Sequence, residues 1–591
     1  MAIQSLIQQQ TIEALQTLFN QHFTERDFQI NQTKPEFEGD YTIVLFSLVK
    51  SLRQAPEALG QQIGQQLVQQ SPQLFSGFNV IKGFLNLVIA DAWWLAFLEK
   101  QHSNPQFGFK PSNGKKVMVE YSSPNTNKPL HLGHLRNNFL GWSVAEILKA
   151  TGFEVVKSCI VNDRGIHICK SMIAWQQFAN GETPQSSGIK GDHLVGKYYV
   201  LFNDAYKKEV DELVAGGMAK DAAEKEAPIM KATQKMLVDW EKGDPEVMEL
   251  WKTMNGWVYD GFNKTYQDIG SDFDITYYES NTYLLGKDIV QQGLDKQVFF
   301  RKEDGSIWID LTADGLDEKL VQRKDGTSVY ITQDIGLAQL KYEQYGIDQS
   351  IYVVGNEQNY HLKVLQLICQ KLGMPNAENI YHLSYGMVEL TTGKMKSREG
   401  TVVDADDLVH EMTETARQHT EALGKVDGFT QNELAELYHM LGMGAMKFYL
   451  LRVDPKKTMV FNPADSIDFH GFTGPFIQYT YARIRSILGK NPEAIQMNLQ
   501  DTLLPLEKDL LVETEQFEAV IAQAAAEHNP SVVANYAFHL AKLFNSFYAE
   551  HSVSGAETND KKHLRLAIAV ITSQVLHNSM KLLGIQVPER M

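Results

Sequence analysis

The feature that most limits the fold of this 591-residue chain is a strand, a helix and a second strand that follow one another between residues 116 and 161. Residues 116–121 and 155–161 are apolar runs typical of buried strands. Residues 133–150 have the apolar spacing of a helix, and Gly152 stands where a helix commonly ends. Such strands pair in parallel with a right-handed crossover, and ligands bind beyond their carboxyl ends. The loop of residues 122–134 is therefore predicted to line a ligand site.

Two histidines open the predicted helix, in the segment 124–134 that reads PNTNKPLHLGH. Backbone N–H groups and the helix dipole favour a phosphate at a helix N-terminus. His131 and His134 lie three residues apart and so share one face of the first turn, while Gly133 lets a base or ribose approach the backbone. Taken alone, this H-x-G-H pattern is also compatible with two incidental surface histidines.

A second motif, Lys394-Met395-Lys396-Ser397-Arg398, follows a strand-like run that contains Met387 and Val388. Its three cations could hold a polyphosphate, although a basic turn of this kind is usually just solvated. The combination is far more specific than either part. An H-x-G-H loop followed some 260 residues later by a K-M-x-S loop, with a parallel-sheet pattern between them, indicates nucleotide chemistry.

Acidic, amide and aromatic residues form a third group, made up of Glu120, Glu279, Tyr330, Asp334 and Gln358. Glu120 ends an otherwise apolar strand beside the first motif. Tyr330 and Asp334 are four residues apart and share a face if their segment is helical. Carboxylates are the planar, bidentate acceptors that a guanidinium requires. Any one of these residues alone is equally compatible with a cap or a surface charge.

Several other functions are excluded or disfavoured. Residues 191–197 read G-x-x-x-x-G-K but lack the following Ser or Thr of a P-loop, and no G-x-G-x-x-G occurs. The three cysteines, at 159, 169 and 369, form no C-x-x-C pair, so we expect no metal site and a reducing, cytoplasmic location. No run of 18 apolar residues occurs, so we expect no membrane partner.

The pattern along the chain predicts an α/β protein of four parts. These are an α/β N-terminal domain (1–112), a Rossmann-like nucleotide-binding catalytic domain built on a parallel sheet (113–400) with an inserted domain at about 176–326, a connecting helical region (401–465) and an all-α C-terminal bundle (466–591).

These motifs resemble those of the class I aminoacyl-tRNA synthetases and, within that class, of the arginyl-tRNA synthetases. Residues 119–136 resemble the extended HIGH region of the family, and residues 394–398 resemble its KMSKS loop. The segment GPFIQY at 474–479 is similar to the opening of the anticodon-binding bundle, and the last ten residues are also typical. The first ~110 residues resemble a domain that touches the outer corner of tRNA.

The resemblance implies that ATP and L-arginine form an arginyl-adenylate, and that the arginyl group then passes to tRNA(Arg). It implies ATP contacts from His131, Gly133, His134, Met387, Val388, Lys394 and Met395. It implies arginine contacts from Glu120, Asn125, Glu279, Tyr330, Asp334 and Gln358. We expect a monomer that uses ATP with Mg²⁺, and His131, His134 and Lys394 as catalytic residues.

One departure from the family pattern concerns the second lysine of KMSKS, which is Ser397 here. We expect Lys128, in the H-x-G-H loop, to supply the missing catalytic cation. Tyr479 and Arg483 are plausible tRNA contacts, although residues at such spacing more often belong to a core. Because the net charge is −17, tRNA should bind through local basic patches, and its affinity should fall steeply with salt.

Two other functions remain open at this point. One is a different enzyme with the same fold, either another class I synthetase or an H-x-G-H adenylyl transferase, although a small transferase has no use for the C-terminal bundle. The other is a non-catalytic tRNA-binding paralogue, against which the intact His131, His134 and Lys394 argue.

Overall fold

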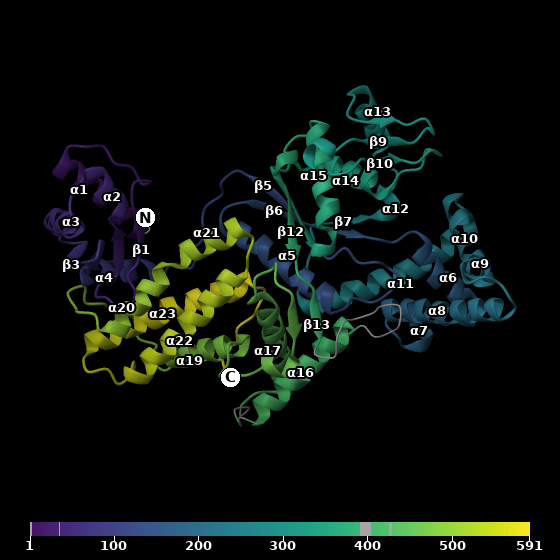
Figure 1. The fold of residues 1–591 in the computed structure, drawn as a ribbon. Helices are drawn as coiled ribbons and strands as arrows, with labels where there is room; N and C mark the ends of the chain where they lie inside the picture. Colours follow the sequence, from purple (N-terminus) through teal and green to yellow (C-terminus); the bar gives the residue numbers. More distant parts are fainter. Residues whose placement is uncertain (1–2, 35, 391–402, 423, 425–427) are drawn as a thin grey trace.

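A five-stranded parallel sheet forms the centre of the molecule, a computed structural model that describes residues 3–34, 36–390, 403–422, 424 and 428–591 (Figure 1). Its strand order is β12 (Ile380–Tyr385), β11 (Gln349–Gly355), β5 (Lys116–Glu120), β6 (Glu154–Val161) and β7 (Ile275–Tyr278). Every neighbouring pair is parallel. The helices that connect these strands include α5 (Leu132–Ala150), α6 (Ile166–Phe178), α14 (Tyr330–Tyr345) and α15 (Asn359–Lys371). The predicted parallel α/β sheet is thereby confirmed.

Helix α5 packs unusually close to strand β5. A Cβ atom at Gly141 would lie 2.4 Å from Cβ and Cγ of Tyr121, so only glycine lets the helix approach this closely. Nearly all of α5 is buried, including the polar residues Arg136, Asn137 and Asn138. The helix that carries H-x-G-H is thus fixed against the sheet along its length.

The region 176–326, expected to form one insertion, contains a strand of the main sheet. Helices α7 (Pro184–Ser187), α8 (Gly191–Ala215), α9 (Lys220–Glu226), α10 (Pro228–Glu241) and α11 (Pro245–Ile269) form one unit. Strand β7 then returns to the main sheet, so the expected boundaries of 176–326 do not hold as one continuous insertion. After α12 (Glu279–Thr282) and α13 (Lys287–Asp295), a small antiparallel sheet follows, made of β8 (Phe300–Arg301), β9 (Ile307–Ile309) and β10 (Lys319–Gln322).

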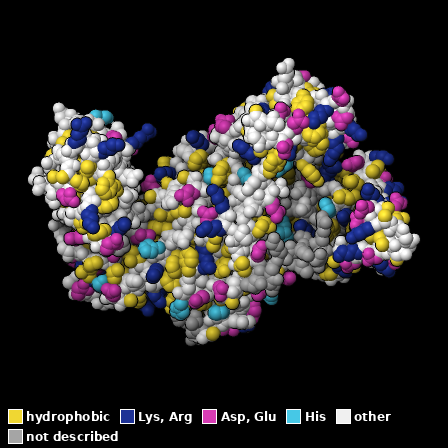
Figure 2. Space-filling model, in the orientation of Figure 1, with side chains coloured by type: hydrophobic (Ala, Val, Ile, Leu, Met, Phe, Trp, Pro, Cys, Tyr) yellow, Lys and Arg dark blue, Asp and Glu magenta, His cyan; other side chains and the backbone are white. Residues whose placement is uncertain are grey.

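The N-terminal domain has an antiparallel sheet in the order β1 (Gln29–Gln32), β2 (Tyr41–Val44), β4 (Phe84–Ile89) and β3 (Phe75–Ile81). Its helices are α1 (Ile3–Phe19), α2 (Phe46–Leu52), α3 (Pro56–Gln70) and α4 (Asp91–Gln101). It lies at one end of the molecule, opposite the helices of the insertion (Figure 1). On the face shown in Figure 2, basic and acidic side chains are interspersed over this domain rather than separated.

The chain after residue 402 is almost entirely helical in its described parts. Helices α16 (Ala405–Ala422) and α17 (Gln431–Leu451) lead to β14 (Met459–Phe461), which pairs in parallel with β13 (Val388–Leu390), and to the short α18 (Pro463–Ser466). The bundle consists of α19 (Gly474–Gly489), α20 (Pro505–Glu515), α21 (Phe517–Glu527), α22 (Ser531–Glu550) and α23 (Asn559–Leu582). Among the described residues, no helix combines the length and apolarity needed to cross a membrane.

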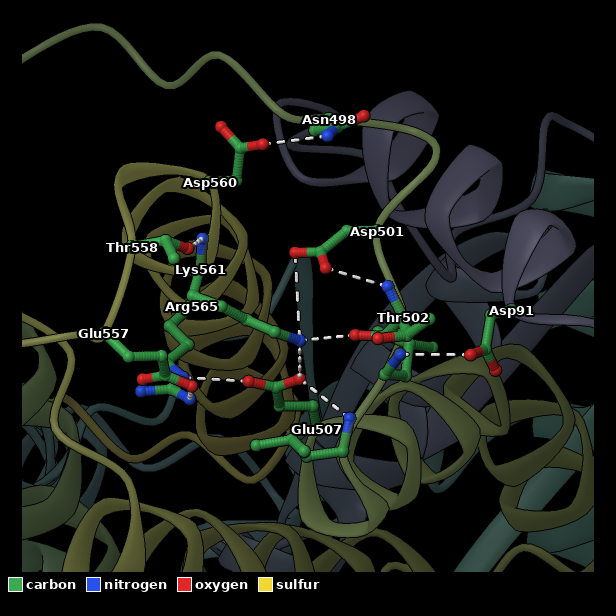
Figure 3. Close-up of polar contacts among 12 residues, drawn as sticks. Asp91, Asn498, Asp501, Thr502, Glu507, Glu557, Thr558, Asp560, Lys561 and Arg565 are labelled. Carbon is green, nitrogen blue, oxygen red and sulfur yellow. Dashed lines mark hydrogen bonds and ion pairs between the residues drawn. The ribbon is translucent and has the colours of Figure 1, made fainter.

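Buried charges fasten the bundle and join it to the N-terminal domain (Figure 3). Glu507 of α20 is fully buried and accepts hydrogen bonds of 2.8 Å from both Lys561 and Arg565 of α23. Next to this cluster, Asp91 at the start of α4 accepts a hydrogen bond of 3.0 Å from the backbone N–H of Leu503. The N-terminal domain is therefore held directly against the bundle.

Candidate active site

The two histidines of H-x-G-H cap helix α5. His131 is the N-cap residue, and its Nδ1 accepts a hydrogen bond of 3.1 Å from the Gly133 N–H. His134 Nδ1 accepts one of 3.1 Å from the His131 N–H, and the two ring centroids are 4.0 Å apart. Because each Nδ1 accepts, the neutral ring carries its proton on Nε2. Each imidazole therefore has one Nε2–H left as a donor.

Both rings stay neutral near pH 7. Burial, and then the nearby charge of Lys128, lower the pKa of His131 to about 4. Burial, followed by His131, holds the pKa of His134 well below its usual value. The pair can thus donate hydrogen bonds to a phosphate without titrating in the physiological range.

A strained turn connects β5 to this loop. Ser122 and Ser123 have φ angles of +81° and +43°, in the region that favours glycine. Asn137 Oδ1 accepts a hydrogen bond of 2.6 Å from the Ser122 N–H, and Asn138 Nδ2 donates one of 3.2 Å to Ser122 Oγ. Sequence reasoning missed both asparagines, although two amides on the buried face of an apolar helix were a usable signal.

Arg136 fixes the segment that leads toward the second motif. Its side chain is 1% exposed, and its guanidinium donates to the carbonyls of Gly386 and Met387 on one side and Lys457 on the other. Met387 is partly exposed, whereas Val388 is buried at the start of β13. The catalytic candidate Lys394 and its neighbour Met395 lie outside the described residues.

The chain that follows the second motif returns to the H-x-G-H loop. The Leu132 N–H donates to the Val403 carbonyl at 3.2 Å, and the Ala405 N–H donates to the Leu130 carbonyl at 3.0 Å. A cavity of about 270 Å³ opens beside these residues. Lys128, His131, His193, Lys197, Tyr199 and Asp404 are among the residues that line it. Lys128, the expected catalytic cation, is thus beside the histidine loop.

Three acidic residues lie at the carboxyl edge of the sheet, and two of them, Glu120 and Asp334, already have a partner. Glu120, the last residue of β5, is 7% exposed and pairs with the fully buried Lys341 of α14 at 2.5 Å. Asp334 accepts from His361 Nε2 at 2.6 Å. The charges of Lys341 and, when it is protonated, His361 keep these carboxylates oriented.

Glu279 begins α12, directly after strand β7. Burial raises its pKa, Arg164 opposes this, and Asp163 and Asp334 raise it further. Glu279 and Asp334 therefore lie close enough to repel each other, which makes this a place suited to a cation.

The other residues expected to contact arginine are more exposed to solvent. Tyr330 opens α14 and is 74% exposed, four residues before Asp334 on the same helix. Asn125 is exposed in the loop that follows β5, and Gln358 is exposed at the end of the short 3-10 helix (Asn356–Gln358) that follows β11. The sheet edge thus assembles residues from four separate segments of the chain.

Tyr479 and Arg483 lie far from this edge, on helix α19 of the bundle. The Arg483 guanidinium lies 4.9 Å from the centre of the Tyr479 ring and donates to Asn545 Oδ1 at 2.5 Å. Both side chains are half-buried. They form a cation–π pair on helix α19.

The fold and the histidine loop define the class of protein. Residues 98–462, more than half of the chain, match the family model described as "tRNA synthetases class I (R), catalytic domain". Residues 477–591 match the DALR anticodon binding domain, and residues 2–89 match the arginyl tRNA synthetase N terminal domain.

Comparison with known proteins gives the particular family. The chain is 54% identical over its full length to the arginine–tRNA ligase of Flavobacterium psychrophilum, and 52% identical to that of Bacteroides fragilis, in both cases covering the whole relative. It also matches the solved arginyl-tRNA synthetase of Thermus thermophilus with a TM-score of 0.80 over 100% of both chains, at 24% identity. The chain belongs to the arginyl-tRNA synthetase family.

Proposed function

We propose that this protein joins L-arginine to tRNA(Arg) at the expense of ATP. The carboxylate of arginine attacks the α-phosphorus of ATP, so that a C–O–P bond forms and pyrophosphate leaves. A hydroxyl of the terminal adenosine of tRNA then attacks the carbonyl carbon, and AMP leaves. The observation that carries this proposal is a neutral histidine pair at a helix N-terminus beside a group of carboxylates, all at one edge of a parallel sheet.

The first step requires positioning rather than proton transfer. The attacking carboxylate is already ionised at neutral pH, and pyrophosphate is a good leaving group. The two Nε2–H groups and the N-terminus of α5 would stabilise charge on the phosphates, with Gly133, Met387 and Val388 contacting the nucleotide. Lys394 and Met395 belong to the same proposed ATP site.

The arginine substrate would be held by the acidic edge. Asp334 and Glu279, together with Tyr330, are proposed to receive the guanidinium. Asn125, in the loop after β5, and Gln358, in the short 3-10 helix after β11, are proposed to hold the α-amino end. Glu120 would contribute the charge that Lys341 keeps in place.

ATP is proposed to enter with Mg²⁺, which would be held mainly by the triphosphate, because Mg²⁺ keeps several waters and rarely occupies an all-protein cage. We propose that the enzyme acts as a monomer in the cytoplasm. The location is supported by three buried cysteines that form no disulfide. Tyr479 and Arg483 are proposed tRNA contacts, because unpaired bases can stack on aromatic rings and on guanidinium groups.

A single assay tests the proposal against its alternatives. Each of the twenty amino acids is offered with ATP and total tRNA, and both pyrophosphate exchange and charged tRNA are measured. We expect arginine alone to be charged. Charging of another amino acid would indicate a different class I synthetase, and adenylation of a small molecule without charging would indicate a transferase. Binding of tRNA without either reaction would indicate a non-catalytic paralogue.

A further inference from the structure

A partly buried ionic cluster joins the inserted helices to the segment that begins at Val403. Lys190, just before α8, places its Nζ 2.5 Å from Asp406 Oδ2 and 3.2 Å from Asp192 Oδ2. It also donates to Thr265 Oγ1 of α11, which donates to Asp406 Oδ1 at 2.8 Å. Both oxygens of Asp406 are therefore held by the insertion.

The helices are shaped to admit this cluster. Asp192 is fully buried on α8, and a Cβ atom at Gly261 of α11 would lie 2.2 Å from its Oδ1. Only glycine leaves room for the carboxylate at that position. The cluster is thus a specific junction between α8, α11 and the start of α16.

The side chain of Lys190 supplies the positive charge of this junction. Asp192, His193 and Asp406 could by distance alone hold a metal ion. The Lys190 ammonium already lies within 3.2 Å of two of those carboxylates, so it supplies the positive charge that a metal would bring. His193 adds a second contact, at 3.2 Å from both Asp404 and Asp406.

The segment held in this way touches the histidine loop. Val403 and Ala405 exchange backbone hydrogen bonds with Leu132 and Leu130, on either side of His131. Asp404 lies between them and caps α16 through hydrogen bonds to the N–H groups of Asp406 and Asp407. A displacement of Asp406 would therefore be transmitted within two residues to the loop that positions His131.

We propose that Lys190 is a positioning residue for the ATP site. It fixes Asp406, and through the segment 403–405 it fixes the H-x-G-H loop. This inference rests on the proposed function, because it takes ATP to be the ligand of that loop. The proposed arginine contacts Glu279 and Asp334 take no part in the junction, so its effect should fall on ATP and not on arginine.

The test replaces Lys190 by methionine, which preserves length and removes the charge. In pyrophosphate exchange we expect kcat/KM for ATP to fall by about tenfold or more, and KM for arginine to change by less than about twofold. Lys235→Met is the matched control, because Lys235 forms an exposed pair with Asp239 elsewhere in the insertion. This control should leave both constants unchanged.

A double variant shows whether Lys190 acts through Asp406. If it does, Lys190→Met combined with Asp406→Asn should lose no more than the worse single variant, whereas independent effects would multiply. If Lys190→Met does not fold, Thr265→Val removes one contact to Asp406 and should still lower kcat/KM for ATP selectively. A lower melting temperature with normal ATP kinetics would overturn the inference, as would equal losses for ATP and arginine. An inactive wild-type protein would instead contradict the proposed function itself.

Discussion

The guanidinium of Arg136 donates to the carbonyl of Gly386, although the two residues are 250 positions apart in the chain. Arg136 follows the second histidine of H-x-G-H by two residues, and Gly386 precedes the strand that leads to residue 391. The same guanidinium donates to Lys457 at 2.9 Å, which anchors β14 beside β13. One buried cation thus sets the spacing between the two segments that are proposed to hold ATP.

Replacing Arg136 by methionine should therefore slow adenylate formation. Burial lowers the pKa of Arg136 to about 10, which still leaves the side chain charged at pH 7. The groups that accept its hydrogen bonds are backbone carbonyls. We expect a loss of about a hundredfold in the rate of pyrophosphate exchange, because a misplacement of about 1 Å in a reacting site can cost that much. Arg485→Met is the control, because Arg485 pairs with Glu589 at the exposed end of the bundle. Equal activity of the two variants would contradict this role.

His131 caps helix α5 through Nδ1 and is proposed to donate a hydrogen bond to ATP through Nε2–H. A substitution can separate these two functions. Asparagine is a good N-cap residue but has no group at the position of Nε2. We expect His131→Asn to keep the melting temperature of the wild type and to lose about a hundredfold in adenylation rate. His131→Ala, which loses both functions, should in addition unfold at a lower temperature. If His131→Asn retained full activity, Nε2 would have no part in the reaction.

The same histidine predicts a dependence of stability on pH. Its pKa falls from 6.5 in the unfolded chain to about 4 in the folded one, mainly through burial. The unfolded state therefore binds more protons between these values, and stability is lost as the pH drops from about 6.5 toward 4. The melting temperature of His131→Asn should decline less over this interval than that of the wild type.

His193 should make the stability of the protein depend on pH in the opposite direction. Contacts of its Nε2 with Asp404 and then Asp406, both at 3.2 Å, raise its pKa to about 10, while burial opposes the shift, and Asp192 and Lys190 also face it. Its stabilising effect is complete below about pH 6.5 and is lost as the pH rises through about 10. The difference in melting temperature between the wild type and His193→Gln should be large at pH 7 and small above pH 10. A constant difference across that range would show that the charge of His193 contributes nothing.

The elements around the histidine loop were predictable because their signals are local. The apolar runs of 116–121 and 155–161 and the helical spacing of 133–150 appear as β5, β6 and α5. Strand β7 was missed because it has only four residues and lies between charged helical segments. The pairing of Glu120 with Lys341, 221 residues apart, depends on how the sheet and α14 pack, which no local pattern reports.

A substitution at Lys128 tests how the protein compensates for Ser397, which stands in place of the second lysine of the KMSKS loop. If Lys128 supplies the cation that Ser397 cannot, Lys128→Ala should slow adenylate formation by about a hundredfold. Lys110→Ala is a suitable control, because Lys110 forms an exposed pair with Glu518 at 3.3 Å, remote from the cavity that Lys128 lines. A single-turnover measurement of adenylate formation distinguishes this from an effect on transfer to tRNA. A near-normal rate for Lys128→Ala would show that the cation comes from elsewhere.

The buried charges of the bundle make a prediction about stability alone. Glu507 accepts hydrogen bonds from both Lys561 and Arg565 (Figure 3), and replacing it by alanine would leave the two cations without this carboxylate in a buried position. Breaking a buried pair in this way costs about 3–5 kcal/mol, so we expect a marked fall in melting temperature. Glu557→Gln is the matched control, because Glu557 meets the same Arg565 from the exposed side. Adenylation by folded Glu507→Ala protein should remain normal, since the bundle holds none of the proposed ATP or arginine contacts. Similar melting temperatures for the two variants would show that the burial of Glu507 adds nothing to these ion pairs.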